Sequence, residues 1–341
     1  MSLAPEEFAP SGVYLDSATL GLAPRRSVEA MRAHEDARAA GEVDARVIDA
    51  YVEHGRAAFA TLIGRSPADV ATGSQTSQLV GLVAASLAPG SVVLAAQEDF
   101  TSVLFPFLQA PGLDVRLVPL ERLLDAVTDE VDLVAVSAVQ SADGRMVDLP
   151  GLAEAAARHG ARTLVDVTQA AGWLPLEGVV ADYVVGSGYK WLLGPRGTAF
   201  LAVRPELLDA VPPLAAGWYA GVSRWDSIYG PPLRLAQDAR RLDVSPAWGC
   251  WVGHAPALDL LLEVGVDRIH RHDVALADAF RDGLGLPPTG SAIVSAPCPP
   301  DAPARLAAAG VRASVRAGRL RLSFHLYSTE SDVEAVLRAL A

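Results

Sequence analysis

A single lysine, Lys190, is the residue whose type points most directly to chemistry in this 341-residue sequence. The chain has 28 lysines and arginines together, and all but Lys190 are arginine. An arginine side chain keeps its proton near neutral pH and cannot form an imine, whereas a buried lysine amine can do both. The arginine bias and the absence of asparagine are typical of GC-rich coding. Either Lys190 is a surface residue left by chance, or it does what arginine cannot.

The residues around Lys190 favour the second interpretation. A strand candidate, Tyr183–Val185, leads through a Gly-Ser-Gly turn to Tyr189 and Lys190, and a Gly-Pro bend follows. Glycines allow a backbone to approach a ligand closely. Ser187 and Tyr189 add hydroxyl groups beside the amine. The segment therefore predicts a site for a small, anionic cofactor.

An aspartate ends another apolar strand candidate. In the segment LVDVTQ, Asp166 closes the strand and Gln169 follows three residues later. A buried carboxylate needs a cationic partner, and a protonated pyridine nitrogen would serve. The aspartate would then hold the proton on the ring and keep the ring an electron sink. The other interpretation is that Asp166 caps the segment that follows.

A third segment, Ala71–Gly81 (ATGSQTSQLVG), runs from a loop rich in glycine and hydroxyl groups into an apolar helix that we expect to continue to Leu87. Backbone N–H groups at a helix N-terminus bind phosphate readily. Gln75, Thr76 and Ser77 stand where such groups would be offered. A plain Ser/Thr helix cap is the alternative.

The elements that must position these residues alternate between short strands and amphipathic helices over the first two thirds of the chain. This alternation predicts an α/β fold with a mostly parallel sheet flanked by helices, in which ligands collect at the carboxyl ends of the strands. The expected strands are Ser91–Ala95, Asp114–Val118, Asp132–Val136, Arg162–Val165, Tyr183–Val185 and Thr198–Val203, and the expected helices include Glu121–Val127 and Asp148–Arg158.

The amino-acid composition changes after this region. Residues 211–232 are rich in proline and aromatic residues and predict an irregular connection. We therefore expect an N-terminal arm (1–12), a large domain (13–235) and a smaller α+β C-terminal domain (236–341), with Gly12–Pro24 packing near the last. The expected elements of the small domain are the helices Ala255–Val264 and Arg268–Leu284, the strand Arg319–His325 and the helix Ser331–Leu340.

Composition excludes several classes of function. The net charge of -12 argues against a nucleic-acid-binding protein, because phosphate contacts need clustered positive charge. Met1–Pro10 has no apolar run, so we expect that it is not a signal peptide, and no apolar run is long enough to span a membrane. The two cysteines, Cys250 and Cys298, have no metal-type spacing. We expect a cytoplasmic protein without a disulfide framework or a metal site.

Taken in order, these motifs resemble the class V aminotransferase family of the fold-type I enzymes that use pyridoxal 5'-phosphate (PLP). The shared pattern has a threonine-rich helix start, an aromatic residue near the ring, Asp-x-x-Gln, Ser-x-His/Tyr-Lys with a Gly-Pro bend, and a late Arg-x-Ser. The likeness covers nearly the whole chain, from YLDSA at 14–18 to RLSFHLYSTESD at 321–332.

The resemblance implies a role for each matching residue. Lys190 would form the internal aldimine and carry the α-proton. Asp166 would pair with the pyridine nitrogen and Gln169 would reach the ring hydroxyl. The expected phosphate ligands are Gln75, Thr76, Ser187 and Tyr189. Phe100 matches the ring-stacking position, where most relatives carry histidine. Arg321 matches the arginine that binds the substrate carboxylate, although it could equally be an exposed strand-edge residue beside Arg319. Ser141 stands where many relatives have an asparagine near the substrate.

The cofactor alone does not choose the reaction, because PLP serves transamination, racemisation and bond cleavage alike. Cysteine desulfurases of this family carry a nucleophilic cysteine shortly before the late arginine, and residues 310–318 contain none. The first hypothesis is therefore an aminotransferase of class V acting on a small amino acid.

The alternative is a carbon–carbon or carbon–sulfur lyase of kynureninase or sulfoxide-lyase type. Phe100, the Thr76-Ser77 pair, Tyr189 and Gly217-Trp218-Tyr219 resemble the kynureninase branch, although the asparagines of its substrate pocket are absent. A non-catalytic binding protein with this fold is a third hypothesis, disfavoured because no DNA-binding segment or basic stripe accompanies the fold.

The resemblance also implies a homodimer with its active site at the subunit interface. Ser245 matches a threonine that reaches the phosphate of the neighbouring subunit. The aromatic segment Trp218–Tyr229 is a candidate for interface, substrate lid or core.

Overall fold

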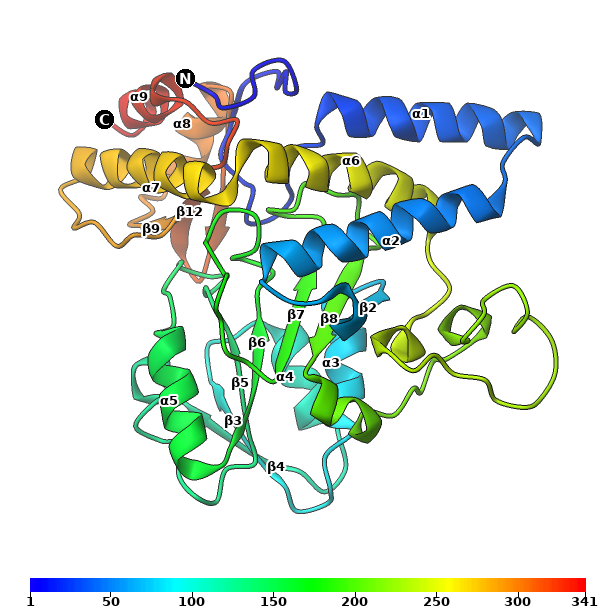
Figure 1. Cartoon of the computed structure of the whole chain (residues 1–341). Coiled ribbons are helices and arrows are strands. Elements are labelled where there is room, and N and C mark those ends of the chain that lie inside the picture. The colour runs from blue at the N-terminus through cyan, green and yellow to red at the C-terminus, as the bar shows by residue number, and fades with distance from the viewer.

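A seven-stranded sheet forms the centre of the molecule in the computed structural model, which describes residues 1–341 (Figure 1). The strand order is β2-β8-β7-β6-β5-β3-β4. Neighbouring strands from β7 to β4 are parallel, and β8 is antiparallel to both β7 and β2. The strands are β2 (Val70–Gly73), β3 (Val92–Ala96), β4 (Asp114–Val118), β5 (Leu133–Ser137), β6 (Arg162–Asp166), β7 (Tyr183–Ser187) and β8 (Ala199–Val203).

Helices cover both faces of this sheet, which explains why its strands are continuous apolar runs. Along β5, Val134 and Val136 join a core with the helices α2 (Ala45–Leu62) and α5 (Leu149–His159). The alternate residues Leu133 and Ala135 join a second core with α3 (Thr76–Ala84) and α4 (Thr101–Leu108). Successive side chains of a strand point to opposite faces, so one strand serves both cores.

The edge strand β4 is different. Its residues are exposed or half-buried, and Arg116 pairs there with Asp114 and Glu130. Charged side chains on an edge strand discourage pairing with another chain. The predicted strand Asp114–Val118 is confirmed in place, and the other five predicted strands lie within one or two residues of those observed.

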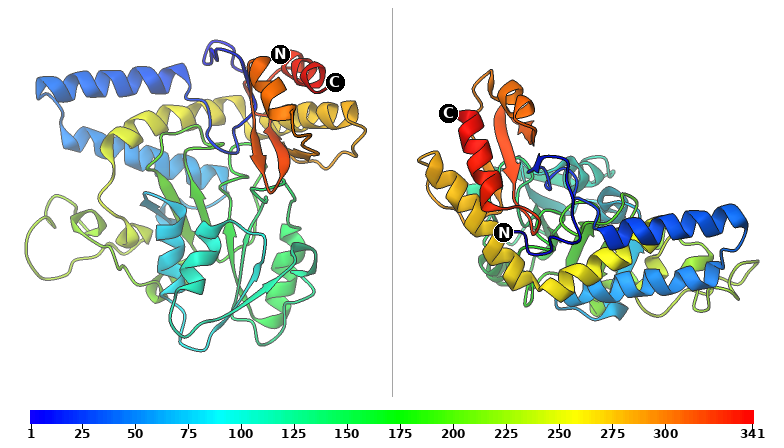
Figure 2. Two further views of the ribbon diagram at one scale, coloured as in Figure 1. Left: turned by 180° about the vertical axis from the view of Figure 1, so that it is seen from behind. Right: turned by 90° about the horizontal axis from the view of Figure 1, so that it is seen from above.

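The C-terminal part is built on a small antiparallel sheet of order β11-β12-β9. The N-terminal segment reaches this part, because β1 pairs with β10 and the Ser323 amide donates to the Leu15 carbonyl. This confirms the expectation that Gly12–Pro24 packs there, and both termini lie at that end of the molecule (Figure 2). The elements are β1 (Val13–Tyr14), β9 (Ile293–Ala296), β10 (Val311–Arg312), β11 (Ser314–Arg316), β12 (Arg319–Ser323), α8 (Ala302–Ala308) and α9 (Glu330–Leu340).

Two long helices connect the parts. The helix α6 (Trp248–Val264) packs against α2 and α1 (Arg25–Ala40). Gly265, with a positive φ of 85°, joins it directly to α7 (Val266–Gly283), and the two run end to end along the top of the molecule (Figure 1). The domain boundaries at residues 12 and 235 stay predictions.

Two helix predictions are wrong. Glu121–Val127 forms a short 3-10 turn, Leu120–Arg122, followed by further turns. The apolar helix from the loop at 71–75 ends at Ala84, short of the expected Leu87. The Ser86 hydroxyl donates to the Val83 carbonyl just beyond this helix end.

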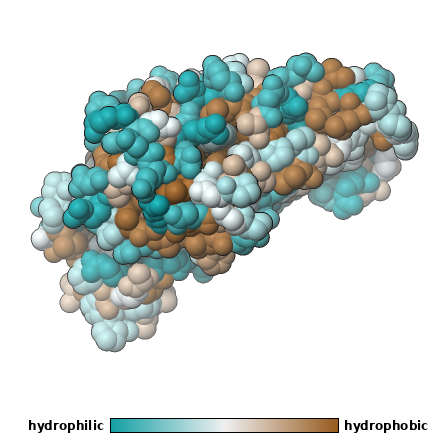
Figure 3. Space-filling view, turned by 90° about the horizontal axis from the view of Figure 1, so that it is seen from below, coloured by the Kyte–Doolittle hydropathy of each residue, from teal (hydrophilic) through white to brown (hydrophobic).

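Residues 211–232 are irregular as predicted, with a single 3-10 turn at Trp218–Ala220. No helix combines the length and apolar character that crossing a membrane requires. Seen from below, the surface carries separate apolar areas between hydrophilic ones (Figure 3). Exposed apolar residues of this kind are normal for folded proteins.

Candidate active site

The carboxyl ends of β5, β6 and β7 meet at one edge of the sheet and place Ser137, Asp166 and Ser187 side by side. A small pocket opens at this edge, as expected for parallel strands. It is lined by Thr76, Phe100, Ser102, Ser137, Ser141, Asp166, Thr168, Gln169, Ser187, Tyr189 and Lys190. Eight of the ten residues predicted for the site therefore lie around one space; Gln75 and Arg321 are outside this lining.

Lys190 is 5% exposed and forms no ion pair within 4 Å. Its Nζ lies 5.2 Å from the centre of the Phe100 ring and 5.8 Å from that of Tyr189. Burial lowers the pKa of the Lys190 amine, and the attraction of Asp166 only partly opposes this. A larger share of the amine is therefore neutral near pH 7 than in an exposed lysine, and only the neutral amine is a nucleophile.

Close packing explains the glycines near Lys190. A Cβ on Gly188 would lie 2.3 Å from the buried ring of His254, and one on Gly21 would lie 2.0 Å from the Lys190 carbonyl oxygen. These glycines make room for protein atoms, so the interpretation of the turn as a place for close cofactor approach is replaced by one of internal packing. The N-terminal segment is fastened here by a hydrogen bond from the Gly21 amide to the Tyr189 carbonyl.

Asp166 is 4% exposed and accepts one hydrogen bond, from the Thr168 amide to Oδ1 at 2.8 Å. Asp166 forms no ion pair within 4 Å. Burial raises the pKa of this carboxyl group, and the nearby Asp99 raises it further, while Lys190 and the bonds from Thr168 act in the opposite direction. A buried carboxylate without an ion-pair partner fits a cationic ligand group such as a protonated pyridine nitrogen.

Three hydroxyl groups gather at the first turn of α3. The Thr76 Oγ1 lies 2.8 Å from the Ser187 Oγ and 3.3 Å from the Thr168 Oγ1, and the Ser187 amide donates to Thr168 at 3.0 Å. The N-cap residue, Gln75, makes no side-chain cap. The alternative of a Ser/Thr cap is thus excluded, and the first amides of the helix stay available to an anion.

Gln169 is fully engaged with its neighbours. Its Nε2 donates to the Ala18 carbonyl and to the Ser141 Oγ, both at 2.9 Å, and its Oε1 accepts from the Trp191 indole at 2.7 Å. The amide thereby ties the N-terminal segment to the residue after Lys190. Its predicted contact with a ring hydroxyl stays a proposal.

Asp99 supports two residues of the pocket lining, Ser137 and Phe100, and the sequence did not reveal this role. Its carboxylate accepts bonds from the Ser137 hydroxyl at 2.5 Å and the Ser137 amide at 2.7 Å, and from the Phe100 amide at 2.7 Å. It therefore fixes the backbone at the Phe100 ring. Ser137 and Ser102 were also missed, whereas Thr168 lies inside the Asp166–Gln169 motif, where its hydroxyl was a usable signal.

Arg321 is 2% exposed and lies on β12, the middle strand of its sheet. The alternative of an exposed strand-edge arginine is therefore excluded. Its Nη1 donates to the Ser141 carbonyl and its Nη2 to the Thr19 Oγ1, both at 2.5 Å. The carboxylate of Asp16 lies 3.6 Å from Nη2. Burial and then the charge of Arg316 lower the pKa of this guanidinium, Asp16 opposes both, and the net pKa is about 10.

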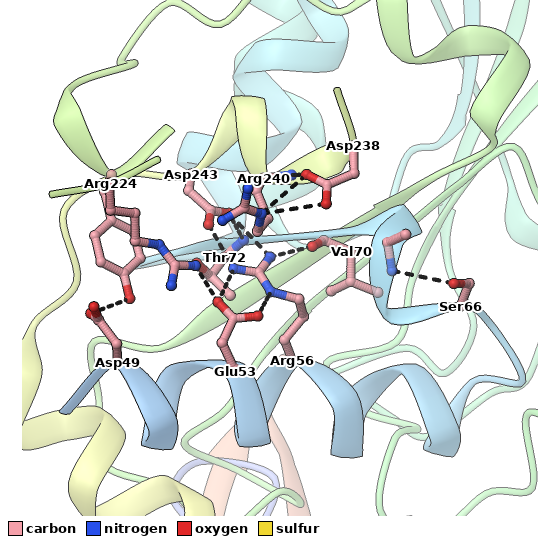
Figure 4. A network of polar contacts seen from close by, with 12 residues as sticks. Asp49, Glu53, Arg56, Ser66, Val70, Thr72, Arg224, Asp238, Arg240 and Asp243 are labelled. Atoms are coloured by element: carbon pink, nitrogen blue, oxygen red, sulfur yellow. Dashed lines mark hydrogen bonds and ion pairs between the residues drawn. The ribbon is translucent and has the colours of Figure 1, made fainter. Parts of the chain in front are cut away.

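A buried ionic network supports the loop that precedes α3 (Figure 4). The Asp243 carboxylate accepts from the Arg56 Nη2 at 2.6 Å and from the Thr72 amide at 2.7 Å. Arg56 and Arg224 also both pair with Glu53. The network joins α2 and the irregular segment to the end of β2, from which the loop leads to Thr76.

Neither cysteine lines the pocket. The Cys250 Sγ donates to the Arg196 carbonyl at 3.2 Å, and Cys298 contacts the Pro299 carbonyl. Ser245, exposed just beyond the network, also lies outside the lining.

Comparison with known proteins gives a consistent picture. Residues 13–300 match the family model described as Aminotransferase class-V. The uncharacterized aminotransferase YcbU of Bacillus subtilis is 31% identical over 322 residues, covering 85% of this chain and 83% of its own. Isopenicillin N epimerase of Streptomyces clavuligerus is 27% identical, covering 97% and 94%. The cysteine desulfurase CsdA of Escherichia coli superposes with a TM-score of 0.85 over 98% of this chain and 96% of its own; at 24% identity this likeness shows the fold alone.

Proposed function

Because the chain belongs to the class V aminotransferase family, we propose that it binds PLP through Lys190 and transaminates a small amino acid. The observation that carries the proposal is the state of Lys190. It is the chain's one lysine, it is buried at a strand-end pocket without an ion-pair partner, and burial depresses its pKa. These are the properties of an amine that reacts with a carbonyl group.

The residues present fit the cofactor. The buried carboxylate of Asp166, which has no ion-pair partner, suits a protonated ring nitrogen. The ring of Phe100 offers a stacking face, and the uncapped start of α3 with Thr76 and Ser187 suits a phosphate group. Gln75 and Tyr189 are proposed as further phosphate ligands. When bound, PLP supplies an electron sink for charge at the substrate α-carbon.

The chain's own groups then do three things. Arg321 holds the substrate carboxylate with the guanidinium that now donates to Thr19 and Ser141. The Lys190 Nζ would take the proton from the substrate α-carbon and deliver it to the carbon that receives the amino group, since an amine with a depressed pKa exchanges protons near neutral pH. Asp166 keeps its charge beside the ring.

A lyase of kynureninase or sulfoxide-lyase type is the alternative reaction. Phe100 favours it, since its ring faces the Lys190 Nζ without the imidazole that most relatives place there. We do not propose desulfuration through a persulfide on the protein, because neither cysteine lines the pocket.

We also propose that two chains form a homodimer around this site. Phe100 is 45% exposed and Gln75 is exposed in the single chain, which leaves the proposed cofactor bed open on that side. A partner subunit would cover these residues and bring Ser245 to the phosphate.

Product analysis tests the function. The PLP-loaded protein is incubated with single amino acids, and the cofactor and products are then identified. Accumulation of pyridoxamine phosphate with release of a 2-oxo acid is expected. Release of pyruvate, ammonia or alanine with PLP intact would establish the lyase instead. Absence of any change with every amino acid tested would overturn both.

A further inference from the structure

Three arginines share one face of the β11–β12 hairpin. Arg316 stands directly opposite Arg319, and Ser314 stands opposite Arg321, with Ala317 and Gly318 at positive φ in the tight turn. Like charges in directly opposed cross-strand positions destabilise a sheet. Asp16, 3.6 Å from Arg321, is the only carboxylate within 4 Å of any of the three. The hairpin therefore carries positive charge that the chain does not neutralise.

Two of these arginines converge on one neutral atom. The Arg321 Nη2 donates to the Thr19 Oγ1 at 2.5 Å, and the Arg316 Nη2 donates to the same oxygen at 3.2 Å. A hydroxyl group can accept both bonds but offsets neither charge. Two guanidinium groups held around one small space are an arrangement that carboxylates satisfy.

Arg319 is turned elsewhere. It donates to the Oγ and the carbonyl oxygen of Ser295 on β9, and not to Thr19. The hairpin thus holds a converging pair, Arg316 and Arg321, and a third arginine of equal charge that does not join it.

The pair spans from the pocket to a larger open groove. Arg321 is buried on the pocket side, where it also binds the Ser141 carbonyl, while Arg316 is exposed and lines a groove of about 870 Å³ between the N-terminal segment and the hairpin. The charged residues of this groove are Arg312, Arg316 and Asp16, so its balance is positive. Asp16 is buried, and its Oδ1 has no hydrogen-bond partner.

The shared contact sets the spacing of the two guanidinium groups, because both donate to the Thr19 Oγ1. A substrate with its α-carboxylate on Arg321 would therefore have Arg316 within reach of a short side chain.

We propose that the substrate is an amino acid with a second carboxylate on a short side chain, of aspartate or glutamate size. Arg321 binds its α-carboxylate and Arg316 its side-chain carboxylate, on either side of Thr19. This inference rests on the proposed function and adds a specificity-determining residue to it.

Binding of two unreactive acids tests the pair directly. Succinate carries two carboxylates and propionate one, and neither has an amine. Calorimetric titrations use the PLP-loaded and the cofactor-free protein at low ionic strength, because salt screens exposed charges. We expect succinate to bind at least tenfold more tightly than propionate. In Arg316→Gln we expect about a tenfold loss for succinate, about 1.4 kcal/mol, and less than a twofold change for propionate.

The matched control is Arg319→Gln, which removes the same charge from the same face and should change neither affinity. Equal binding of the two acids to the unaltered protein overturns the inference, as does an equal loss for both in Arg316→Gln. The proposed function is judged separately. If the loaded protein shows the absorbance of a lysine-bound cofactor and L-alanine shifts it as readily as L-aspartate, only the proposed recognition of a second carboxylate is refuted.

Discussion

The pKa values of two buried cations in this molecule, Arg56 and Lys190, are shifted in opposite directions. In the network of Figure 4, Arg56 is 2% exposed, and its ion pairs with Asp243 and Glu53 outweigh burial and raise its pKa. In the pocket, Lys190 is 5% exposed, and burial outweighs the attraction of Asp166 and lowers its pKa. Burial is the same in both places, and direct pairing is the difference. A buried charge with partners cannot be removed without leaving those partners unpaired, whereas one without them is available for chemistry.

Removing the amine is the most severe way to break this comparison. Lys190→Ala should abolish the absorbance of the lysine-bound cofactor and reduce turnover by about 1000-fold or more, because no other lysine can take its place. Absorption spectra and turnover measure both effects. Lys190→Arg keeps the charge but cannot form an imine and should be equally inactive; an unchanged absorption band in either variant would contradict the assignment.

Replacing Arg56 or Lys190 with methionine tests the comparison through the free energy of unfolding. Arg56→Met leaves Asp243 buried without its partner and should lower the free energy of unfolding of the cofactor-free protein by about 3–5 kcal/mol. Lys190→Met removes an unpaired buried charge and should raise it by about 1–2 kcal/mol. Denaturant titrations measure both.

Arg204→Met is the control for these exchanges. Arg204 pairs with Asp182 at 3.1 Å but is 46% exposed, so its loss should cost less than about 1 kcal/mol. Destabilisation of Lys190→Met by as much as Arg56→Met would mean that Lys190 is a structural charge.

The carboxylate of the pocket is the next target. Asp166→Asn keeps the size of the side chain but cannot hold a proton on the ring nitrogen by its charge, so turnover should fall by about 100-fold and cofactor affinity should weaken. Near-normal turnover would remove Asp166 from the mechanism. Asp182→Asn, at the start of the strand that ends at Ser187, is a control outside the pocket.

The smallest expected effect is a pH dependence. The pKa of Lys190 is lowered in the folded chain to about 8 from an ordinary value of 10.5. Between these values the unfolded chain binds the extra proton, so the stability of the cofactor-free protein should rise with pH through this window. The rise should be absent from Lys190→Met, and denaturant titrations at a series of pH values would show it. A rise of equal size in both proteins would assign it to other groups.

The sequence predicts the parts of the site that depend on local order along the chain. Asp166, Ser187 and Lys190 follow directly from strands with apolar patterns, and parallel strands bring their carboxyl ends to one edge. Thr76 follows from the start of a helix after a glycine-containing loop.

The sequence could not predict the parts of the site that depend on the order of the strands and on contacts between distant segments. Asp99 bonds Ser137 only because β3 lies beside β5. Arg321 and Arg319 have the same place in the side-chain alternation of β12, and only Arg321 is covered by Thr19 and Ser141, which are distant in the sequence. Thr19 joins the site because the N-terminal segment folds back onto the hairpin, a contact between residues about 300 positions apart.

The central claim is that the amine of Lys190 holds the cofactor, and chemical trapping tests it most directly. The protein is loaded with PLP, reduced with borohydride and digested, and the pyridoxyl label is located by mass spectrometry. The account predicts the label on the peptide that contains Lys190 and on no other. A label confined to the N-terminal amine, or no label at all, would contradict it.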